Sequence, residues 1–226
     1  TSRANACEPP GGFALAFDGP EHSVTAAANS ALRIAGDLTL EAWVRVEELG
    51  AIQALITMGG PGESAADNAM FQWRILANGG IEIIHEFGSG VNQTLTFVSP
   101  FPTVGQLEIK WIHLALIRNA TARTYKLVVD DLTSIAAQSY PTNPDGGQDG
   151  FLHIGTDVDG GSDFDGWIDD VRIWNIARAP ADVVATRFTR LNGNEPGLVA
   201  NWHFDEGSGG VSTDLVAGIP VTIDNA

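Results

Sequence analysis

The chain has 226 residues, of which 44% are hydrophobic, and its 28 acidic residues against 12 lysines and arginines give a net charge of −16. This charge repels nucleic acids and anionic lipid surfaces, so we expect neither as a partner. The length suits one domain with a large hydrophobic core.

Cys7 is the only cysteine, so the chain can form no internal disulfide. No apolar run approaches the roughly 18 residues that a membrane-spanning helix needs, and we expect no membrane insertion. The sequence begins at Thr1 without a methionine, and we expect it to be one module of a larger protein with other domains. We place an N-terminal extension at residues 1–12 and a single domain at residues 13–226.

Short runs of β-type residues alternate with clusters of Gly, Pro, Asn and Asp along the chain. The runs recur at intervals of about 8 to 15 residues, as in all-β proteins. In chain order the predicted strands are 14–17, 38–46, 54–58, 71–76, 81–86, 94–98, 111–118, 125–130, 134–137, 151–154, 166–174, 198–204 and 221–223.

One short helix is predicted over residues 180–188. Pro180 stands in its first turn, and Val183, Val184 and Phe188 recur at helical spacing. The sequence has no room for the long crossover helices that parallel strands require. We therefore predict an all-β fold, an antiparallel sandwich of two sheets with a single short helix.

The segment 38–46 alternates strictly between apolar and other residues. Its apolar side chains face the core in the predicted strand, whereas Glu41, Trp43 and Arg45 face away from it. We expect these three side chains to lie on the solvent side of their sheet.

The segment 166–174 reads as a full strand interrupted by two adjacent carboxylates, Asp169 and Asp170. Strict alternation puts Asp170 on the same side as Arg172, which can neutralise it, and puts Asp169 among apolar neighbours. An unpaired carboxylate in an apolar layer costs several kcal/mol, so a cation is one candidate partner for Asp169. Alternatively, Asp169 lies at a strand end and is solvated or hydrogen-bonded.

Several segments, in order, resemble one known family. They are Ala14-Leu-Ala-Phe-Asp-Gly19, Leu38-Thr-Leu-Glu-Ala-Trp-Val44, Trp111-Ile-His-Leu-Ala115, Tyr125-Lys-Leu-Val-Val-Asp130, Gly166-Trp-Ile-Asp-Asp-Val-Arg-Ile-Trp-Asn175 and Gly197-Leu-Val-Ala-Asn-Trp-His-Phe-Asp-Glu-Gly-Ser-Gly209. Together they are similar to the LamG-like jelly-roll family of the concanavalin A-like lectin/glucanase superfamily. The resemblance covers the chain from about Phe13 to about Ile223.

The resemblance implies a jelly roll of two curved antiparallel sheets in a secreted or cell-surface protein, so we expect an extracellular location. It also implies a structural calcium that joins an N-terminal segment to the aspartate before the Val-Arg of the last core strand. In this sequence those acids are Asp18 and Asp169. Asp170 is the alternative ligand if the strand is turned over. Calcium prefers several oxygen ligands, and the Gly turn after Asp18 can offer backbone carbonyls.

No catalytic pattern is present, and we expect the protein not to be an enzyme. Glucanases of the superfamily carry a Glu-x-Asp-x-x-Glu strand that sets two carboxylates on one face. The nearest segment here runs from Glu82 to Glu86 and lacks the middle aspartate.

The loop at residues 157–166 begins with the Asp-x-Asp-Gly of a calcium-binding EF-hand, but Ile168 stands at the twelfth position, where an EF-hand has Glu. A solvated acidic turn is one reading of this loop. The other is a second calcium site, formed with Asp159 and Asp163, that bridges a bound polyol.

Two classes of function remain open. The first is a non-catalytic carbohydrate-binding module, in which Trp43 and Trp167 stack on a sugar ring while Trp73, Trp111 and Trp202 belong to the core. Its ligand-binding residues would be Trp43, Glu41, Arg45, Trp167, Asp159 and Asp163. The second is a structural or adhesive spacer with no small ligand.

Overall fold

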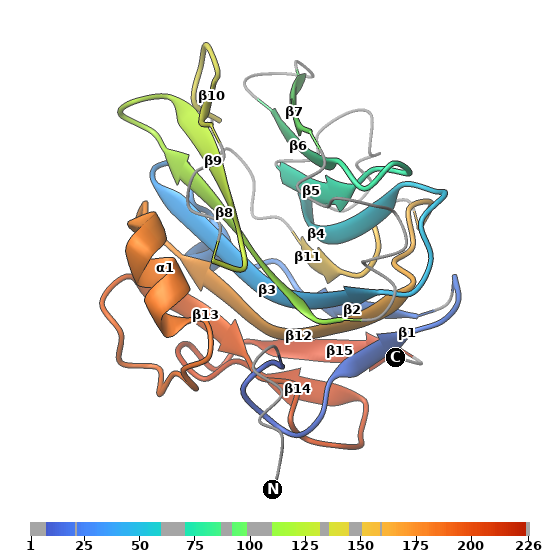
Figure 1. The fold of residues 1–226 in the computed structure, drawn as a ribbon. Helices are drawn as coiled ribbons and strands as arrows, with labels where there is room; N and C mark the ends of the chain where they lie inside the picture. Colours follow the sequence, from blue (N-terminus) through green and yellow to red (C-terminus); the bar gives the residue numbers. More distant parts are fainter. Residues whose placement is uncertain are drawn as a thin grey trace, which may run out of the picture.

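The structure is a computed structural model, and it describes residues 8–20, 22–59, 71–86, 92–98, 110–131, 136–144, 151–158 and 160–224. These residues form two antiparallel sheets packed face to face, with one short helix (Figure 1). The all-β sandwich predicted from the sequence is therefore confirmed. None of the described helices is long and apolar enough to cross a membrane.

The first sheet, called sheet A here, has the strand order β1-β12-β3-β8-β9-β10, and β13 also pairs with β12. Its strands are β1 (Leu15–Phe17), β3 (Leu38–Val46), β8 (Ile112–Asn119), β9 (Thr124–Val129), β10 (Gln138–Ser139), β12 (Gly166–Trp174) and β13 (Leu198–Trp202).

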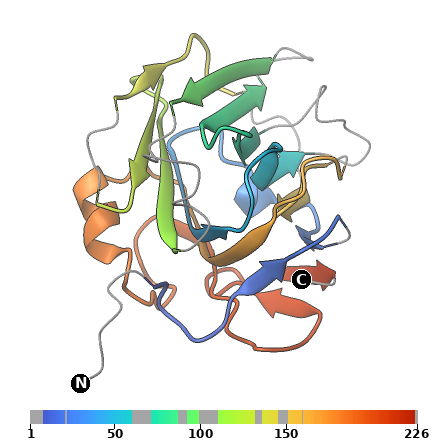
Figure 2. The ribbon, with the colours of Figure 1, turned by 45° about the vertical axis from the view of Figure 1, so that its right-hand side comes forward.

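The second sheet, sheet B, has the order β14-β15-β2-β11-β4-β5-β6-β7. Its strands are β2 (Ser23–Ala26), β4 (Gln53–Gly59), β5 (Phe71–Ile75), β6 (Ile81–Glu86), β7 (Asn92–Phe97), β11 (Phe151–Ile154), β14 (Val211–Thr213) and β15 (Pro220–Asp224). The first and last strands, β1 and β15, lie close together although they belong to different sheets (Figures 1 and 2).

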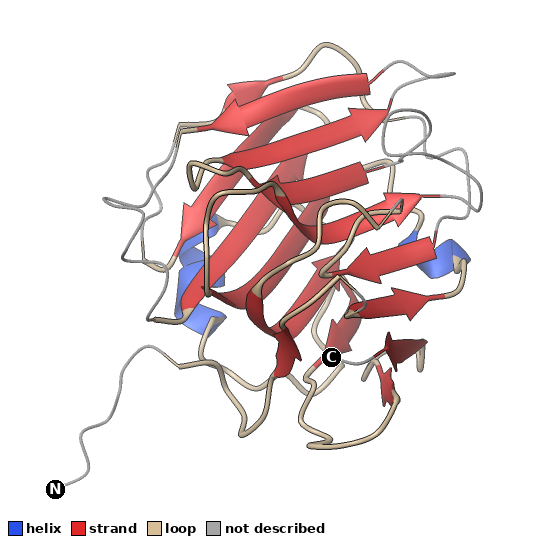
Figure 3. Cartoon of the chain, turned by 90° about the vertical axis from the view of Figure 1, so that its right-hand side faces the viewer, coloured by secondary structure: helices blue, strands red, loops and turns tan. Residues whose placement is uncertain are grey.

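Helical structure is confined to the periphery of the sandwich (Figure 3). Helix α1 spans Pro180–Thr186, beginning at the predicted residue and ending two residues before the predicted end, and a 3-10 turn spans Ser30–Leu32. Two strands were missed by the sequence analysis, β2 and β14, because each is short and partly polar. The predicted strand at 134–137 falls partly outside the described residues, and the strand found nearby is β10.

The core lies between the sheets and follows the alternation of β3. Leu38, Leu40, Ala42, Val44 and Val46 are all buried in it, as predicted. Burying such side chains supplies most of the driving force for folding. Trp73 and Trp202 also belong to this core, whereas Trp111 is only half-buried and precedes β8, so its predicted place in the core is wrong.

A β-bulge interrupts β12 between Asp169 and Arg172, where the register with β3 shifts. Asp170 adopts a left-handed backbone conformation there, with φ of 47°. The bulge adds a residue on the outer side, so Ile168 and Val171 both reach the core although they are three residues apart. The prediction that Asp169 shares a side with Val171 and Ile173 is wrong for this reason.

Beneath α1, a network of buried charges lies on the outer face of sheet A. The Glu41 carboxylate of β3 lies within ion-pair distance of Arg172 (3.4 Å), of His113 Nε2 (3.4 Å) and of Arg178, which precedes the helix. Arg172 also pairs with Asp170 and donates to the carbonyl oxygen of Thr189 (2.8 Å). The network ties the α1 segment to the central strands.

The pKa of Glu41 shows which effect is larger in this network. Burial alone would raise it, but the His113 ring and the Arg172 and Arg178 guanidinium groups outweigh burial and lower the pKa from 4.5 to about 2. A carboxyl whose pKa is lowered on folding stabilises the protein above its unfolded pKa. This stabilisation is lost as the pH falls from about 4.5 through about 2.

We predict that Glu41→Gln destabilises the protein strongly at neutral pH, because it leaves two buried arginines short of a counter-charge. As the pH falls from about 4.5 through about 2, wild-type Glu41 becomes protonated and loses its charge, as the glutamine variant has done at every pH. The difference in unfolding free energy between variant and wild type should therefore shrink by about 3 kcal/mol. Urea unfolding at a series of pH values measures it. Glu47→Gln, at an exposed site, is the control, and a Glu41→Gln deficit that is independent of pH would contradict the assignment.

Candidate functional site

An aromatic and cationic patch lies on the outer face of sheet A, at the end away from α1. The Arg45 guanidinium lies 4.5 Å from the ring centre of Trp167, its register partner on β12. On the other neighbour of β3, strand β8, Ile112 pairs with Val44. Continuing this antiparallel register by one residue places Trp111 opposite Arg45. All three side chains are partly exposed. We call Trp111, Arg45 and Trp167 the Trp–Arg platform.

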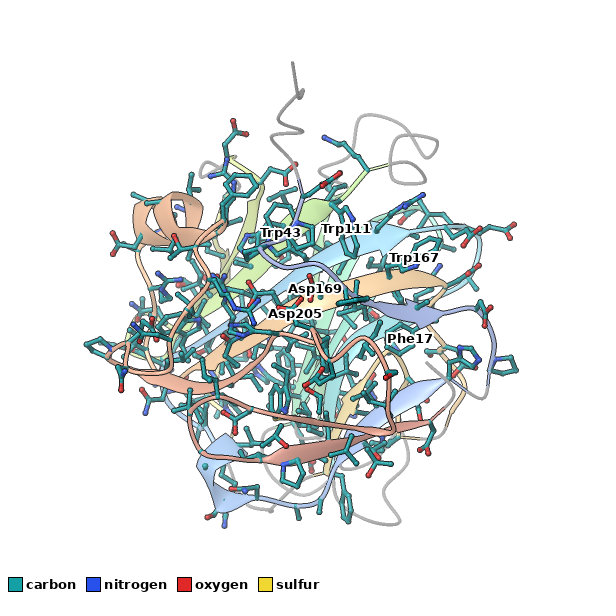
Figure 4. All side chains as sticks on the ribbon, turned by 90° about the horizontal axis from the view of Figure 1, so that it is seen from below. Phe17, Trp43, Trp111, Trp167, Asp169 and Asp205 are labelled. Carbon is teal, nitrogen blue, oxygen red and sulfur yellow. The ribbon has the colours of Figure 1, made fainter. Side chains whose placement is uncertain are left out.

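A hollow of about 180 Å³ adjoins the platform at Trp111. The segment 8–14 forms its opposite wall and supplies backbone groups, including those of Gly11 and Gly12; the lining residues are Glu8, Pro9, Gly11, Gly12, Phe13, Ala14 and Trp111. Figure 4 shows this face of the molecule, with Trp111 and Trp167 labelled. An indole beside backbone hydrogen-bonding groups can bind the apolar face and the hydroxyl groups of a sugar.

Two of the predicted ligand-binding residues do not reach solvent. Trp43 is 1% exposed and Glu41 is fully buried, so the prediction that they lie on the solvent side is wrong. Alternation placed both on the outer face correctly, but the segment after α1 covers that part of the face. The Trp43 Nε1 donates to the carbonyl oxygen of Arg187 (3.0 Å), and Phe188 packs 5.2 Å from its ring.

Asp169 is a fully buried carboxylate with one unsatisfied oxygen. Its Oδ1 accepts from the backbone N–H of Asp170 (2.7 Å), while Oδ2 has no hydrogen-bond partner. Burial, the Asp170 charge and, more weakly, the Asp205 charge raise its pKa from 3.8 to about 8. A proton or a cation is therefore favoured at this oxygen.

Asp205 is the neighbour of Asp169 that the sequence analysis did not select (Figure 4). Its Oδ1 accepts from the backbone N–H groups of Gly12 (2.9 Å) and Phe13 (3.4 Å), and Oδ2 pairs with Arg190. Burial would raise the pKa of Asp205, but these hydrogen bonds and Arg190 lower it. Asp205 thus fastens the segment before β1 to the segment after β13. Its only sequence signal was its place in the recurrent Trp-His-Phe-Asp-Glu segment.

Asp18 does not lie with Asp169. Leu15 pairs with Ile168 and Phe17 with Gly166, so the antiparallel register carries Asp18 away from Asp169. Its side chain is 79% exposed and pairs with His22 (3.1 Å). The structure does not bring together the acid pair expected for one calcium ion, because the strand direction separates its members.

Asp170, the alternative ligand, is already neutralised. It pairs with Arg172, as predicted, and its Oδ1 accepts from Asn201 Nδ2 (2.9 Å). Both of its oxygens therefore have protein partners.

Two described carboxylates of the acidic loop before β12, those of Asp157 and Asp163, are hydrogen-bonded within the loop. Asp157 Oδ1 accepts from the backbone N–H of Gly161 (2.8 Å), and Asp163 Oδ1 accepts from Thr156 Oγ1 (2.9 Å). Asp159 lies outside the described residues. What the structure describes of this loop agrees with the reading as an acidic turn.

Asp169 is the carboxylate best placed to hold a cation, and Asp205, its neighbour, could join it only by giving up its ion pair with Arg190. Among the described residues, no group of three or more His, Cys, Asp or Glu side chains could hold a metal ion. Calcium also binds backbone carbonyl and water oxygens. Two carboxylates and the backbone of the 11–14 segment would therefore offer the kinds of oxygen ligand that calcium prefers. The unsatisfied Oδ2 of Asp169 fits such an ion.

Comparisons with solved structures agree on the fold. A candidate carbohydrate-binding protein from Bacteroides ovatus is 20% identical with a TM-score of 0.67, over 94% of this chain and 58% of that one. The CBM40 module of the Ruminococcus gnavus IT-sialidase, bound to α2,3 sialyllactose, is 16% identical with a TM-score of 0.62, over 78% of this chain and 96% of the module. The NanB sialidase of Streptococcus pneumoniae is 16% identical with a TM-score of 0.61, over 79% of this chain and 28% of the enzyme.

No curated protein sequence matches the chain closely enough to count as a relative. One protein family does match it, over residues 18–184, which is more than half of the chain. The protein therefore belongs to the Laminin_G_3 family of the concanavalin A-like lectin/glucanases superfamily.

Proposed function

We propose that this protein is a non-catalytic carbohydrate-binding module of a larger extracellular protein, stabilised by calcium. The observation that carries the proposal is the Trp–Arg platform, in which two partly exposed indoles flank one arginine beside a hollow. Single partly exposed aromatic side chains are common, but aromatic side chains that lie partly exposed side by side often mark a binding site.

The platform offers the two kinds of contact that a sugar needs. The indole faces of Trp111 and Trp167 can stack on the C–H face of a pyranose ring. Backbone groups of the 8–14 segment and the Arg45 guanidinium can form hydrogen bonds with its hydroxyl groups. Similar structures described as carbohydrate-binding modules, including one with bound sialyllactose, support this class of ligand.

Calcium has a structural role in this proposal. Held by Asp169 and Asp205, it would neutralise a buried carboxylate and join β12 to the segment after β13, which Asp205 fastens to the residues before β1. Because Asp169 and Asp205 are 36 residues apart in sequence, the ion would close the loop between them. It would also fix the wall of the hollow.

We predict that the wild-type protein binds glycans on an array, and that Trp111→Ala and Trp167→Ala each lower the affinity for the bound glycan about tenfold. A tenfold loss corresponds to about 1.4 kcal/mol, the scale of one stacking contact. Phe188→Ala is the matched control, since it removes an aromatic ring that is 42% exposed on the same sheet face but lies outside the platform. If wild type binds no glycan with or without calcium, the alternative role as a structural or adhesive spacer is favoured.

We predict that calcium raises the melting temperature relative to a chelator, and that Asp169→Asn and Asp205→Asn abolish the shift. At a hundredfold excess over Kd the ion adds about 2.7 kcal/mol, or about 5–10 °C for a domain of this size. Because a proton competes for Asp169, the shift should grow as the pH rises from about 6 to about 9.

Asp18→Asn is the control for the calcium experiment, because it removes an exposed carboxylate from the same end of the domain. It should leave the shift intact. A shift lost in Asp18→Asn and kept in Asp205→Asn would restore the site expected from the sequence. Superimposable melting curves with calcium and with chelator would exclude a bound calcium.

A further inference from the structure

We propose that the sugar bound at the Trp–Arg platform carries a carboxylate, and that Arg45 is the residue that binds this group. The inference rests on the proposed function and narrows its ligand from carbohydrates in general to acidic sugars. It depends on the hydrogen-bond partners that the Arg45 guanidinium lacks within the protein.

Arg45 lacks the oxygen partners that the other described arginines have. Arg74, Arg172, Arg178 and Arg190 each pair with a carboxylate, and Arg118, Arg123 and Arg187 donate to backbone carbonyls. Arg33 also has a partner. Within the described chain Arg45 has only the face of Trp167, and its Nε is buried without an acceptor.

This lack is unusual in a chain with 28 acidic residues and 12 basic ones. With acids in such excess, an arginine on a sheet face would readily find a carboxylate of its own chain. A buried N–H group without an acceptor costs free energy comparable to a lost hydrogen bond. The two terminal nitrogens of Arg45 are not among the buried atoms, so an arriving oxygen can bind them.

The stacked position prepares Arg45 for a planar anion. A guanidinium that lies against an indole face keeps the N–H groups on its edge available, and its fork matches both oxygens of a carboxylate. The neighbouring side chain across β3 is Trp111, whose ring faces a hollow. A sugar ring stacked there would place a ring substituent next to Arg45.

Long-range electrostatics do not favour this ligand, so recognition must be local. The net charge of −16 repels anions at a distance. At physiological ionic strength that repulsion is screened over about 8 Å, whereas a direct, charge-assisted contact with Arg45 is screened much less. Binding should therefore depend on this single cation rather than on the overall field.

The test compares three soluble ligands by calorimetry: sialyllactose, lactose, and lactose that carries a sulfate ester in place of sialic acid. We expect sialyllactose to bind at least tenfold more tightly than lactose. Arg45→Gln should remove this difference, lowering affinity for sialyllactose at least tenfold and leaving that for lactose unchanged. Arg45→Lys should restore only part of the difference, because lysine keeps the charge and loses the fork.

The control is Lys126→Gln, which removes one positive charge from β9, where Lys126 pairs with Ile117 toward the other end of β8. It should leave the preference intact, and melting temperatures should show that all variants fold. Equal binding of lactose and sialyllactose, unaffected by Arg45→Gln, would overturn the acidic-sugar assignment but keep the proposed function. A preference for the sulfated sugar over sialyllactose would also overturn it, and binding of no sugar at all would overturn both.

Discussion

The β-bulge in β12 is the constraint on which the outer face of sheet A depends. It lets Ile168 and Val171 both pack into the core while two consecutive acids, Asp169 and Asp170, face outward. The left-handed backbone at Asp170 is unfavourable for most residues, but aspartate tolerates it better than most. The ion pair with Arg172 and the hydrogen bond from Asn201 hold it there. Bulges commonly re-aim side chains at functional sites.

The bulge divides that face into two chemically different halves. Toward α1, Glu41 and Arg172 form a closed charged network that excludes water and fixes the helix. Toward β1, Trp167, Arg45 and Trp111 remain partly exposed. Removing one partner from a buried ion pair is strongly destabilising, so this network resists opening. The open half therefore rests on a stiff support, which favours a preformed binding surface.

The sequence predicted the fold well because alternation and turn residues are local signals. The bounds of β3, β6 and β12 were predicted to the residue. The site was predicted less well, because its geometry depends on non-local pairing. Alternation puts Trp43 outward but cannot show that Arg187 and Phe188 cover it. It also assumes a regular strand, so it misplaces Asp169, and only the pairing of β13 with β12 brings Asp205 close.

The proposed cation site and the proposed sugar platform share one structural element. Gly12 and Phe13 donate to Asp205 beside Asp169, and the same residues line the hollow next to Trp111. A cation held by these acids would order this segment before a sugar arrives, so the sugar would lose less conformational entropy on binding. Coupling of this kind is reciprocal: a sugar that orders the segment must tighten cation binding by the same factor. A structural ion placed here would therefore raise the affinity of the protein for the sugar without contacting the sugar itself.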